Sequence, residues 1–157
     1  MAAPTLTARQ APAGIKLRDG FAAFYAFALD PDISIWETEV QLPSFDGGDP
    51  IDTTTMWNDA WMTKALQQLV DHGEASGVCG YDPACLTQIL SILNRNGSVT
   101  CHLPDTSTYT FWGGLTKFEP EAFKKGEFPT ANFTIVVTNT DTSGNEAGPV
   151  LVSAANT

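Results

Sequence analysis

The feature that most constrains the fold is a long break between two strand-forming segments. Residues 33–42 alternate like a strand and end at Pro43, and strand-like sequence resumes only near Val78. Proline cannot donate a hydrogen bond to a β-ladder, so it marks the end of the first strand. Connections inside compact domains have a median length of about 4 to 6 residues, and long ones tend to be functional. We therefore expect residues 43–72 to project from the domain and reach a partner.

The rest of the chain predicts a mainly β fold with one α-helix. The clearest alternation is residues 131–138, which place Ala131, Phe133, Ile135 and Val137 inward. Residues 21–29 read as a strand that is covered on both faces or that meets another subunit with one face. Residues 98–103 and 108–112 read as a hairpin; Gly113-Gly114 breaks or bulges its second strand, which could continue through Leu115, Lys117 and Phe118. In residues 33–42, strict alternation separates Trp36, Thr38, Val40 and Leu42 from Glu37, Glu39 and Gln41. Residues 149–153 could add a last edge strand.

Two segments have helical periodicity. Asp82 is a good N-cap and Pro83 suits the first helical position, and a stripe of Leu86, Ile89, Leu90 and Leu93 predicts a helix over 83–95 that stops at Gly97. A second stripe, made of Met62, Ala65, Leu66 and Leu69, predicts a helix over 60–70.

Charge is distributed unevenly. The net charge is −10, and residues 30–82 hold eleven acids against one base, Lys64. An acidic surface repels phosphates, which disfavours a protein that grips nucleic acid. Residues 1–18 carry Arg9, Lys16 and Arg18 without an acid, so this basic arm could meet an acidic surface of a neighbouring copy; the alternative is a simply solvated acidic surface. No apolar run suggests a membrane span or a signal peptide, so we expect synthesis in the cytoplasm.

No pattern of reactive residues predicts an enzyme, a cofactor or a metal. Cys79, Cys85, Cys101 and His102 lack the paired spacing of zinc ligands, and residues 46–52 depart from the order of a calcium loop. No serine or cysteine is paired with a histidine at a recognisable spacing. The four tryptophans, Trp36, Trp57, Trp61 and Trp112, could form a sugar-binding platform, but anchors in the core or at subunit contacts are the simpler interpretation.

Several segments together resemble the major tail tube proteins of long-tailed, non-contractile (siphovirus-type) bacteriophages. They are Glu39-Val-Gln-Leu-Pro, Gly48-Asp-Pro-Ile-Asp-Thr-Thr-Thr, Gly73-Glu-Ala-Ser-Gly-Val-Cys-Gly-Tyr-Asp-Pro, the leucine-rich helix, Val99-Thr-Cys-His-Leu-Pro-Asp, Tyr109-Thr-Phe-Trp-Gly-Gly and Phe133-Thr-Ile-Val-Val-Thr-Asn. The resemblance covers roughly residues 20–140. That family usually has little helix between the threonine-rich loop and the Gly-Glu strand, so residues 62–69 should form at most a short helix, or one that orders only on assembly.

The resemblance implies a fold, an assembly and a set of partners. The fold would be a β-sandwich or barrel (20–140) with an N-terminal arm (1–19), a C-terminal arm (141–157) and one helix. Hexameric rings would stack into a tail tube in the virion, through which DNA passes into the host. Its partners would be further copies of the chain, other tail proteins at the tube ends, and tape-measure protein and DNA in the lumen without tight binding; no membrane is implied.

The resemblance also implies roles for three groups of residues. The inter-ring loop would include Ser44, Phe45, Asp46, Asp49, Asp52, Thr54, Trp57 and Trp61; Arg9, Lys16 and Arg18 would belong to the subunit arm; Glu37, Glu39, Asp105, Glu119 and Glu121 are candidate lumen acids. Contractile-tail and secretion-system tubes share this architecture. The alternative is a monomeric acidic β-sandwich that serves as a binding or virion-decoration module for carbohydrate or capsid.

Overall fold

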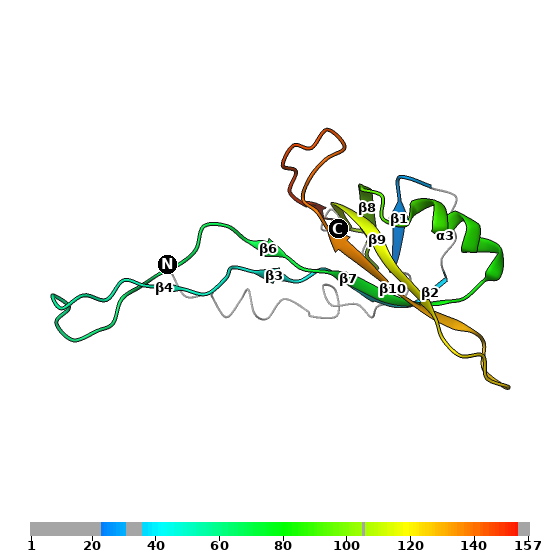
Figure 1. Cartoon of the computed structure of the whole chain (residues 1–157), viewed down its shortest axis with the longest axis horizontal. Coiled ribbons are helices and arrows are strands. Elements are labelled where there is room, and N and C mark those ends of the chain that lie inside the picture. Colours follow the sequence, from blue (N-terminus) through cyan, green and yellow to red (C-terminus); the bar gives the residue numbers. More distant parts are fainter. Residues whose placement is uncertain (1–22, 31–35, 105, 154–157) are drawn as a thin grey trace, which may run out of the picture.

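A single antiparallel sheet organises the chain (Figure 1). The computed structural model describes residues 23–30, 36–104 and 106–153, with the Trp36 side chain excepted. The strands in chain order are β1 (Phe24–Phe27), β2 (Trp36–Gln41), β7 (Ala75–Gly80), β8 (Gly97–His102), β9 (Thr108–Pro120), β10 (Thr130–Val137) and β11 (Val150–Val152). They pair in the order β1-β8-β9-β10-β7-β2, and β11 pairs with β9. The sheet curls into a half-barrel, and the described residues confirm a mainly β fold, with one short α-helix among them.

Alternation along the strands builds the core. In β10, Ala131, Phe133, Ile135 and Val137 are buried while the residues between them are partly exposed, as predicted. Strands β8 and β9 add Val99, Cys101, Phe111 and Leu115 to the same side of the sheet. Because successive side chains in a strand point to opposite faces, one face of the curled sheet packs inward and the other is left polar.

The predicted helix over 83–95 is shorter than expected. A 3₁₀ turn (η1, Pro83–Cys85) leads into α3 (Leu86–Ile92), and the Asp82 side chain caps the turn by accepting a 3.0 Å hydrogen bond from the Ala84 N–H. Ile89 and Ile92 are buried, whereas Leu90 is exposed.

The helix α3 ends at Ile92, before the stop predicted at Gly97. Leu93 is already extended, and Asn94 takes a left-handed conformation (φ 59°). The Asn94 N–H then donates to the Leu115 carbonyl at 2.8 Å, so attachment to β9 ends the helix before Gly97. Gly97 is instead the first residue of β8.

The first two strands also differ from the prediction. Strand β1 covers Phe24–Phe27; of the expected 21–29, residues 28–29 form a turn and residues 21–22 lie outside the described ranges. Tyr25 and Phe27 are buried while Phe24 is 43% exposed, so one face of the strand is open in a single chain, and its contact with another subunit stays a prediction. In β2, a register shift between Glu37 and Glu39 makes Thr38 an extra residue. A bulge of this kind reverses the alternation, because every side chain beyond it changes face. Glu37 and Val40 pair with Cys79 and Gly77, whose side of the sheet is buried. Strict alternation therefore assigned Glu37 to the wrong face, whereas it separated Val40 from Glu39 and Gln41 correctly.

Tyr25 connects the two edges of the half-barrel. Its backbone N–H donates to the Glu37 carboxylate at 3.1 Å, and its hydroxyl donates to the Gln41 carbonyl at 2.5 Å. Strands β1 and β2 share no backbone ladder, so these two bonds from one residue take its place. Burial raises the pKa of the Glu37 carboxyl, since the charged form loses water there.

Strand β9 runs through Gly113 and Gly114 to Pro120, which confirms the predicted continuation through Leu115, Lys117 and Phe118 and shows no break at the two glycines. Both glycines are needed for close packing: a Cβ at Gly113 would lie 2.4 Å from the Val136 carbonyl oxygen. A shift in register between β9 and β10 lies farther along: Thr134 pairs with Lys117 but Ile135 pairs with Leu115, so Thr116 is an extra residue in β9.

Candidate assembly surface

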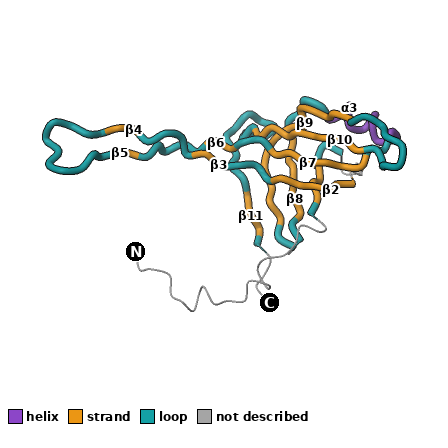
Figure 2. Tube along the Cα trace, turned by 90° about the horizontal axis from the view of Figure 1, so that it is seen from below, coloured by secondary structure: helices purple, strands orange, loops and turns teal. Residues whose placement is uncertain are grey.

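Residues 42–74 form one extended two-stranded ribbon, which we call the arm (Figure 2). Near the sheet, β3 (Phe45–Asp46) pairs with β6 (Asp71–His72), and farther out β4 (Ile51–Asp52) pairs with β5 (Lys64–Ala65). Ten extended residues in each leg reach roughly 33 Å. The long connection therefore does project from the domain.

Threonine and asparagine side chains hold the outer part of the arm together. The Thr53 N–H donates to the Thr63 carbonyl and the Thr63 N–H donates to the Thr54 hydroxyl, both at 3.0 Å. Asn58 closes the tip, because its carbonyl oxygen accepts from the Thr55 N–H at 2.8 Å and its amide donates to the Trp61 carbonyl at 2.9 Å. The threonine-rich sequence thus supplies the hydrogen bonds that a ribbon without a core needs.

The prediction of a helix over 60–70 is wrong. Residues 60–70 are extended or turn-like, with Lys64 and Ala65 in β5. The stripe residues Met62, Leu66 and Leu69 are 69–84% exposed, so a helix here would have no surface against which to pack its apolar face. Most helical stability in proteins comes from packing an amphipathic face, and without it a short segment takes the competing ladder.

The arm carries a concentration of exposed apolar side chains. Met56 and Trp57 at its tip are 101% and 96% exposed, and Trp61 is 83% exposed. Along the two legs the exposed set continues with Phe45, Ile51, Met62, Leu66, Leu69 and Val70. Exposed apolar groups gathered in this way mark an interaction site, whereas single ones are ordinary.

All eight residues predicted for an inter-ring loop lie on the arm and are exposed: Ser44, Phe45, Asp46, Asp49, Asp52, Thr54, Trp57 and Trp61. Their contact with another subunit stays a prediction. The Asp46 side chain accepts the Gly48 N–H at 2.8 Å with Gly48 at φ 77°, so the Asp-Gly-Gly sequence is used as a turn. The Asp52 carboxylate accepts hydrogen bonds from the Thr54 side chain and the Thr54 backbone N–H; both lower the pKa of Asp52, and the side-chain bond has the larger effect.

The arm is strongly acidic. It contains Asp46, Asp49, Asp52, Asp59, Asp71 and Glu74 against Lys64 alone, which is a net charge of −5. Any surface that receives it should offer positive charge as well as apolar area.

An aromatic joint fixes the arm to the sheet. The Phe45 and His72 rings stack with centroids 4.6 Å apart, and Tyr109 and Phe111 of β9 meet His72 edge-on at 6.0 Å. The Tyr109 hydroxyl lies 2.9 Å from His72 Nε2, and the Asn139 side-chain oxygen lies 3.3 Å from Nδ1. His72 is buried, and burial raises the pKa of Tyr109 to about 12. Sequence reasoning missed this joint because its members are far apart in the chain.

The candidate lumen acids occupy different environments. Glu39 and Glu119 lie in one row across the outward face of the sheet, since Glu39 pairs with Val78, Val78 with Asn132, and Asn132 with Glu119. Glu37 is turned inward to Tyr25. Glu121 is exposed and accepts hydrogen bonds from Thr130 and Asn132 at 3.2 and 2.9 Å.

Some of the predicted residues fall outside the described ranges. They are Asp105 and the three basic residues of the predicted N-terminal subunit arm, Arg9, Lys16 and Arg18. In the described ranges, no three His, Cys, Asp or Glu residues gather as metal ligands, and Cys79, Cys85 and Cys101 are not joined in disulfides. No helix in those ranges is long and apolar enough to span a membrane.

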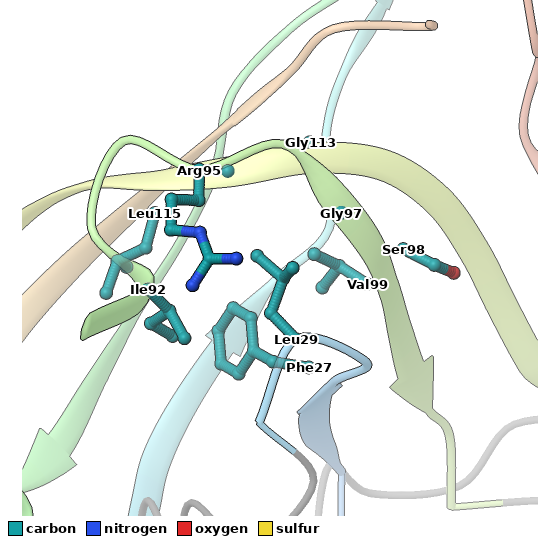
Figure 3. Close-up of a pocket in the computed structure, with 10 residues that line it drawn as sticks. Phe27, Leu29, Ile92, Arg95, Gly97, Ser98, Val99, Gly113 and Leu115 are labelled. Carbon is teal, nitrogen blue, oxygen red and sulfur yellow. The ribbon is translucent and has the colours of Figure 1, made fainter. Parts of the chain in front are cut away.

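The hollow between α3 and the sheet is filled by its own lining. Figure 3 shows Arg95 above Phe27, Leu29, Ile92 and Leu115. These side chains leave about 0 Å³ of space in the hollow, so a water molecule does not fit there. A small molecule would have to displace these side chains, so this hollow is a packed part of the core.

Comparison with known proteins identifies a shared fold. Neither protein-family models nor curated proteins match this sequence. Among solved structures, a chain in the cryo-EM structure of the anti-feeding prophage (AFP) baseplate, 6-fold symmetrised, is similar with a TM-score of 0.57 and 13% identity, over 83% of this chain and 91% of that one. A chain in the tail of the empty GTA particle, computed with C6 symmetry, gives a TM-score of 0.46 and 11% identity over 74% and 83% of the two chains. The curled sheet with its helix is thus a fold found in a prophage baseplate.

Proposed function

We propose that this chain is a structural protein of a phage-type tail, which assembles into hexameric rings that stack into the tail tube. The arm is the observation that carries the proposal. A ribbon with two exposed tryptophans and no core of its own gains stability by burying that surface against another chain. The fold supports the same conclusion, because the AFP chain that shares it comes from an assembly treated as 6-fold symmetric.

The proposed mechanism requires no catalysis. One side of each subunit contacts a different side of its neighbour, so the contacts close into a ring within a layer and continue without closing along the tube axis. In this proposal the virion is of the non-contractile type, and the tube is the path by which DNA leaves the particle.

We assign the outward face of β2, β7, β10 and β9 to the lumen. That face carries Ser76, Thr134 and Asn132 together with the acids Glu39 and Glu119, and Lys117 is its single base in these strands. Tight binding of DNA requires several lysine or arginine contacts to phosphates. A neutral to acidic lining lets DNA and a tape-measure protein move without being held.

The test removes the arm while preserving its joint. Asp46 and Asp71 are direct partners across the ribbon, so replacing residues 47–70 with Asn-Gly joins them through the two-residue loop that antiparallel strands favour. Negative-stain microscopy and sedimentation at rising concentration should show rings and tubes for the unaltered chain and no tubes for the variant, with circular dichroism verifying the fold. An unaltered chain that stays monomeric at every concentration, or normal tubes from the armless variant, would contradict the proposal.

A further inference from the structure

The end of the molecule opposite the arm also projects from the sheet. Strands β9 and β10 continue into a hairpin, residues 117–130, which leaves the sheet on the side away from the arm (Figure 1). Phe123 and Phe128 on this hairpin are 70% and 66% exposed. The chain therefore presents exposed aromatic groups at both ends of its long axis.

The hairpin has the shape of a receiving surface. A hollow of about 640 Å³ opens on it, lined among others by Glu121, Lys124, Glu127 and Phe128. Sites that accept bulky groups typically measure about 300 to 1,000 Å³. Beside the hollow, the Phe123 ring stacks on Tyr81 with centroids 6.1 Å apart, which fixes one aromatic face in place although it is exposed.

The hairpin offers two adjacent lysines, Lys124 and Lys125, to an acidic partner. Three of the five lysine and arginine residues in the described ranges lie in it: Lys117, Lys124 and Lys125. The hairpin also contains three acids, Glu119, Glu121 and Glu127, so its net charge is zero. The Glu121 carboxylate accepts hydrogen bonds from Thr130 and Asn132. The two adjacent lysines stand at the tip, where a turn is closed by the Glu127 N–H donating to the Lys124 carbonyl at 3.3 Å.

We propose that the β9–β10 hairpin of one copy receives the arm tip of a second copy. Trp57 and Trp61 would occupy the hollow and the Phe123 face, and Asp52 and Asp59 of the arm would approach Lys124 and Lys125. Lysine near a tryptophan face adds a cation–π attraction. This inference rests on the proposed function and identifies the surface that the arm of the next subunit contacts along the axis.

A second copy suits the arm better than a membrane does. The apolar tip alone would suit either partner, because tryptophan and methionine also enter lipid interfaces. The arm's net charge of −5 repels anionic lipid headgroups, whereas the hairpin lysines attract it. Contacts between opposite ends of identical subunits also propagate without closing, as an axial contact must.

Charge reversal tests the contact. Lys124→Glu with Lys125→Glu should raise the critical concentration for tube formation by at least about tenfold at low salt, and Asp52→Lys with Asp59→Lys should do the same. Combining all four substitutions in one chain should restore assembly to within about threefold, because each contact again pairs opposite charges. Lys117→Glu, which reverses one lysine on the outward face of the sheet away from the hairpin tip, is the control for a single reversal; it should leave the critical concentration within about twofold, whereas Lys124→Glu alone should raise it more.

The outcomes separate this inference from the proposed function. Tubes that form equally well with either charge-reversed pair, or four substitutions that fail to rescue, overturn the hairpin contact while the tube function stands. An unaltered chain that never polymerises overturns both. Monomers are also mixed with vesicles of phosphatidylcholine and phosphatidylglycerol: a blue shift of tryptophan fluorescence that needs Trp57 and Trp61 would assign the tip to lipid and overturn the inference. No shift with vesicles, and a blue shift on polymerisation, are the expected results.

Discussion

The buried hydrogen bond between Tyr109 and His72 should show strong coupling when both partners are replaced. The Tyr109 hydroxyl and His72 Nε2 lie 2.9 Å apart and both side chains are buried. Tyr109→Phe leaves a buried ring nitrogen without its partner, which should lower the free energy of unfolding by about 1 to 3 kcal/mol. His72→Phe keeps the stack on Phe45 but leaves the hydroxyl unpaired, at a similar cost.

The double variant is the informative one. With both partners replaced by phenylalanine, no buried polar atom of this pair is left unsatisfied, so Tyr109→Phe should cost almost nothing in the background of His72→Phe; the order matters because His72→Phe also removes the contact with Asn139. The sum of the single losses should therefore exceed the loss in the double variant by about 1 to 2 kcal/mol. Urea denaturation of the four proteins measures this, provided the m-values agree.

Hydrogen exchange shows whether the arm is involved. The Gly73 N–H donates to the Ser44 carbonyl at 2.7 Å beside the joint, so its exchange should quicken in each single variant and slow again in the double variant. If the two substitutions are additive within about 0.5 kcal/mol, the bond between Tyr109 and His72 does not stabilise the joint and this reasoning fails.

Three further perturbations follow from burial and packing. Glu37→Gln should stabilise the protein at about pH 7, with the gain fading toward about pH 4 as the native carboxyl takes up its proton, whereas exposed Glu39→Gln should change little; destabilisation by Glu37→Gln at neutral pH in urea titrations would be a contrary result. Burial raises the pKa of the Cys79 and Cys101 thiols from 9.0 to about 11, so native thiols keep protons that unfolded ones lose. The free energy of unfolding should therefore fall as the pH rises from about 9 to about 11, and replacing both cysteines with alanine should flatten that slope; an unchanged slope would refute the assignment. Gly77→Ala puts a Cβ 2.7 Å from a backbone carbonyl of β2 and should cost about 1 to 3 kcal/mol in thermal or urea unfolding, so an unchanged stability would show that β2 can shift.

Features of the fold that depend on residues close together in the chain could be predicted from the sequence. The alternation in residues 131–138 and the Asp82 cap depend on neighbours in the chain, and both were predicted correctly. Glu37 was assigned to the wrong face of β2 because a bulge at Thr38 depends on how the strand pairs with β7, which no local pattern records. Residues 60–70 kept a helical period although the arm offers no surface to pack against, so periodicity alone was insufficient there.

The joint and the hairpin could not have been predicted from sequence for a different reason. His72 looked like an isolated loop histidine beside two acids, and only the fold brings it to Tyr109 and Asn139. Likewise Lys124 and Lys125 look like an ordinary charged turn until the sheet places them at the end opposite an acidic arm. Both depend on three-dimensional placement, which spacing along the chain does not encode.

Acidity and apolar exposure on the same arm have a combined effect under the proposed assembly. An uncharged ribbon with bare tryptophans would associate with any apolar surface, including the arms of other free subunits. With a net charge of −5 on each arm, two arm tips repel each other, while the hairpin lysines attract them. Screening should therefore act on specificity as well as affinity: raising the salt concentration weakens the attraction to the hairpin and the repulsion between arms together. Under the proposed contact, ordered tubes would give way to irregular aggregates at high salt, since the apolar surface persists while the charges that select its partner are screened.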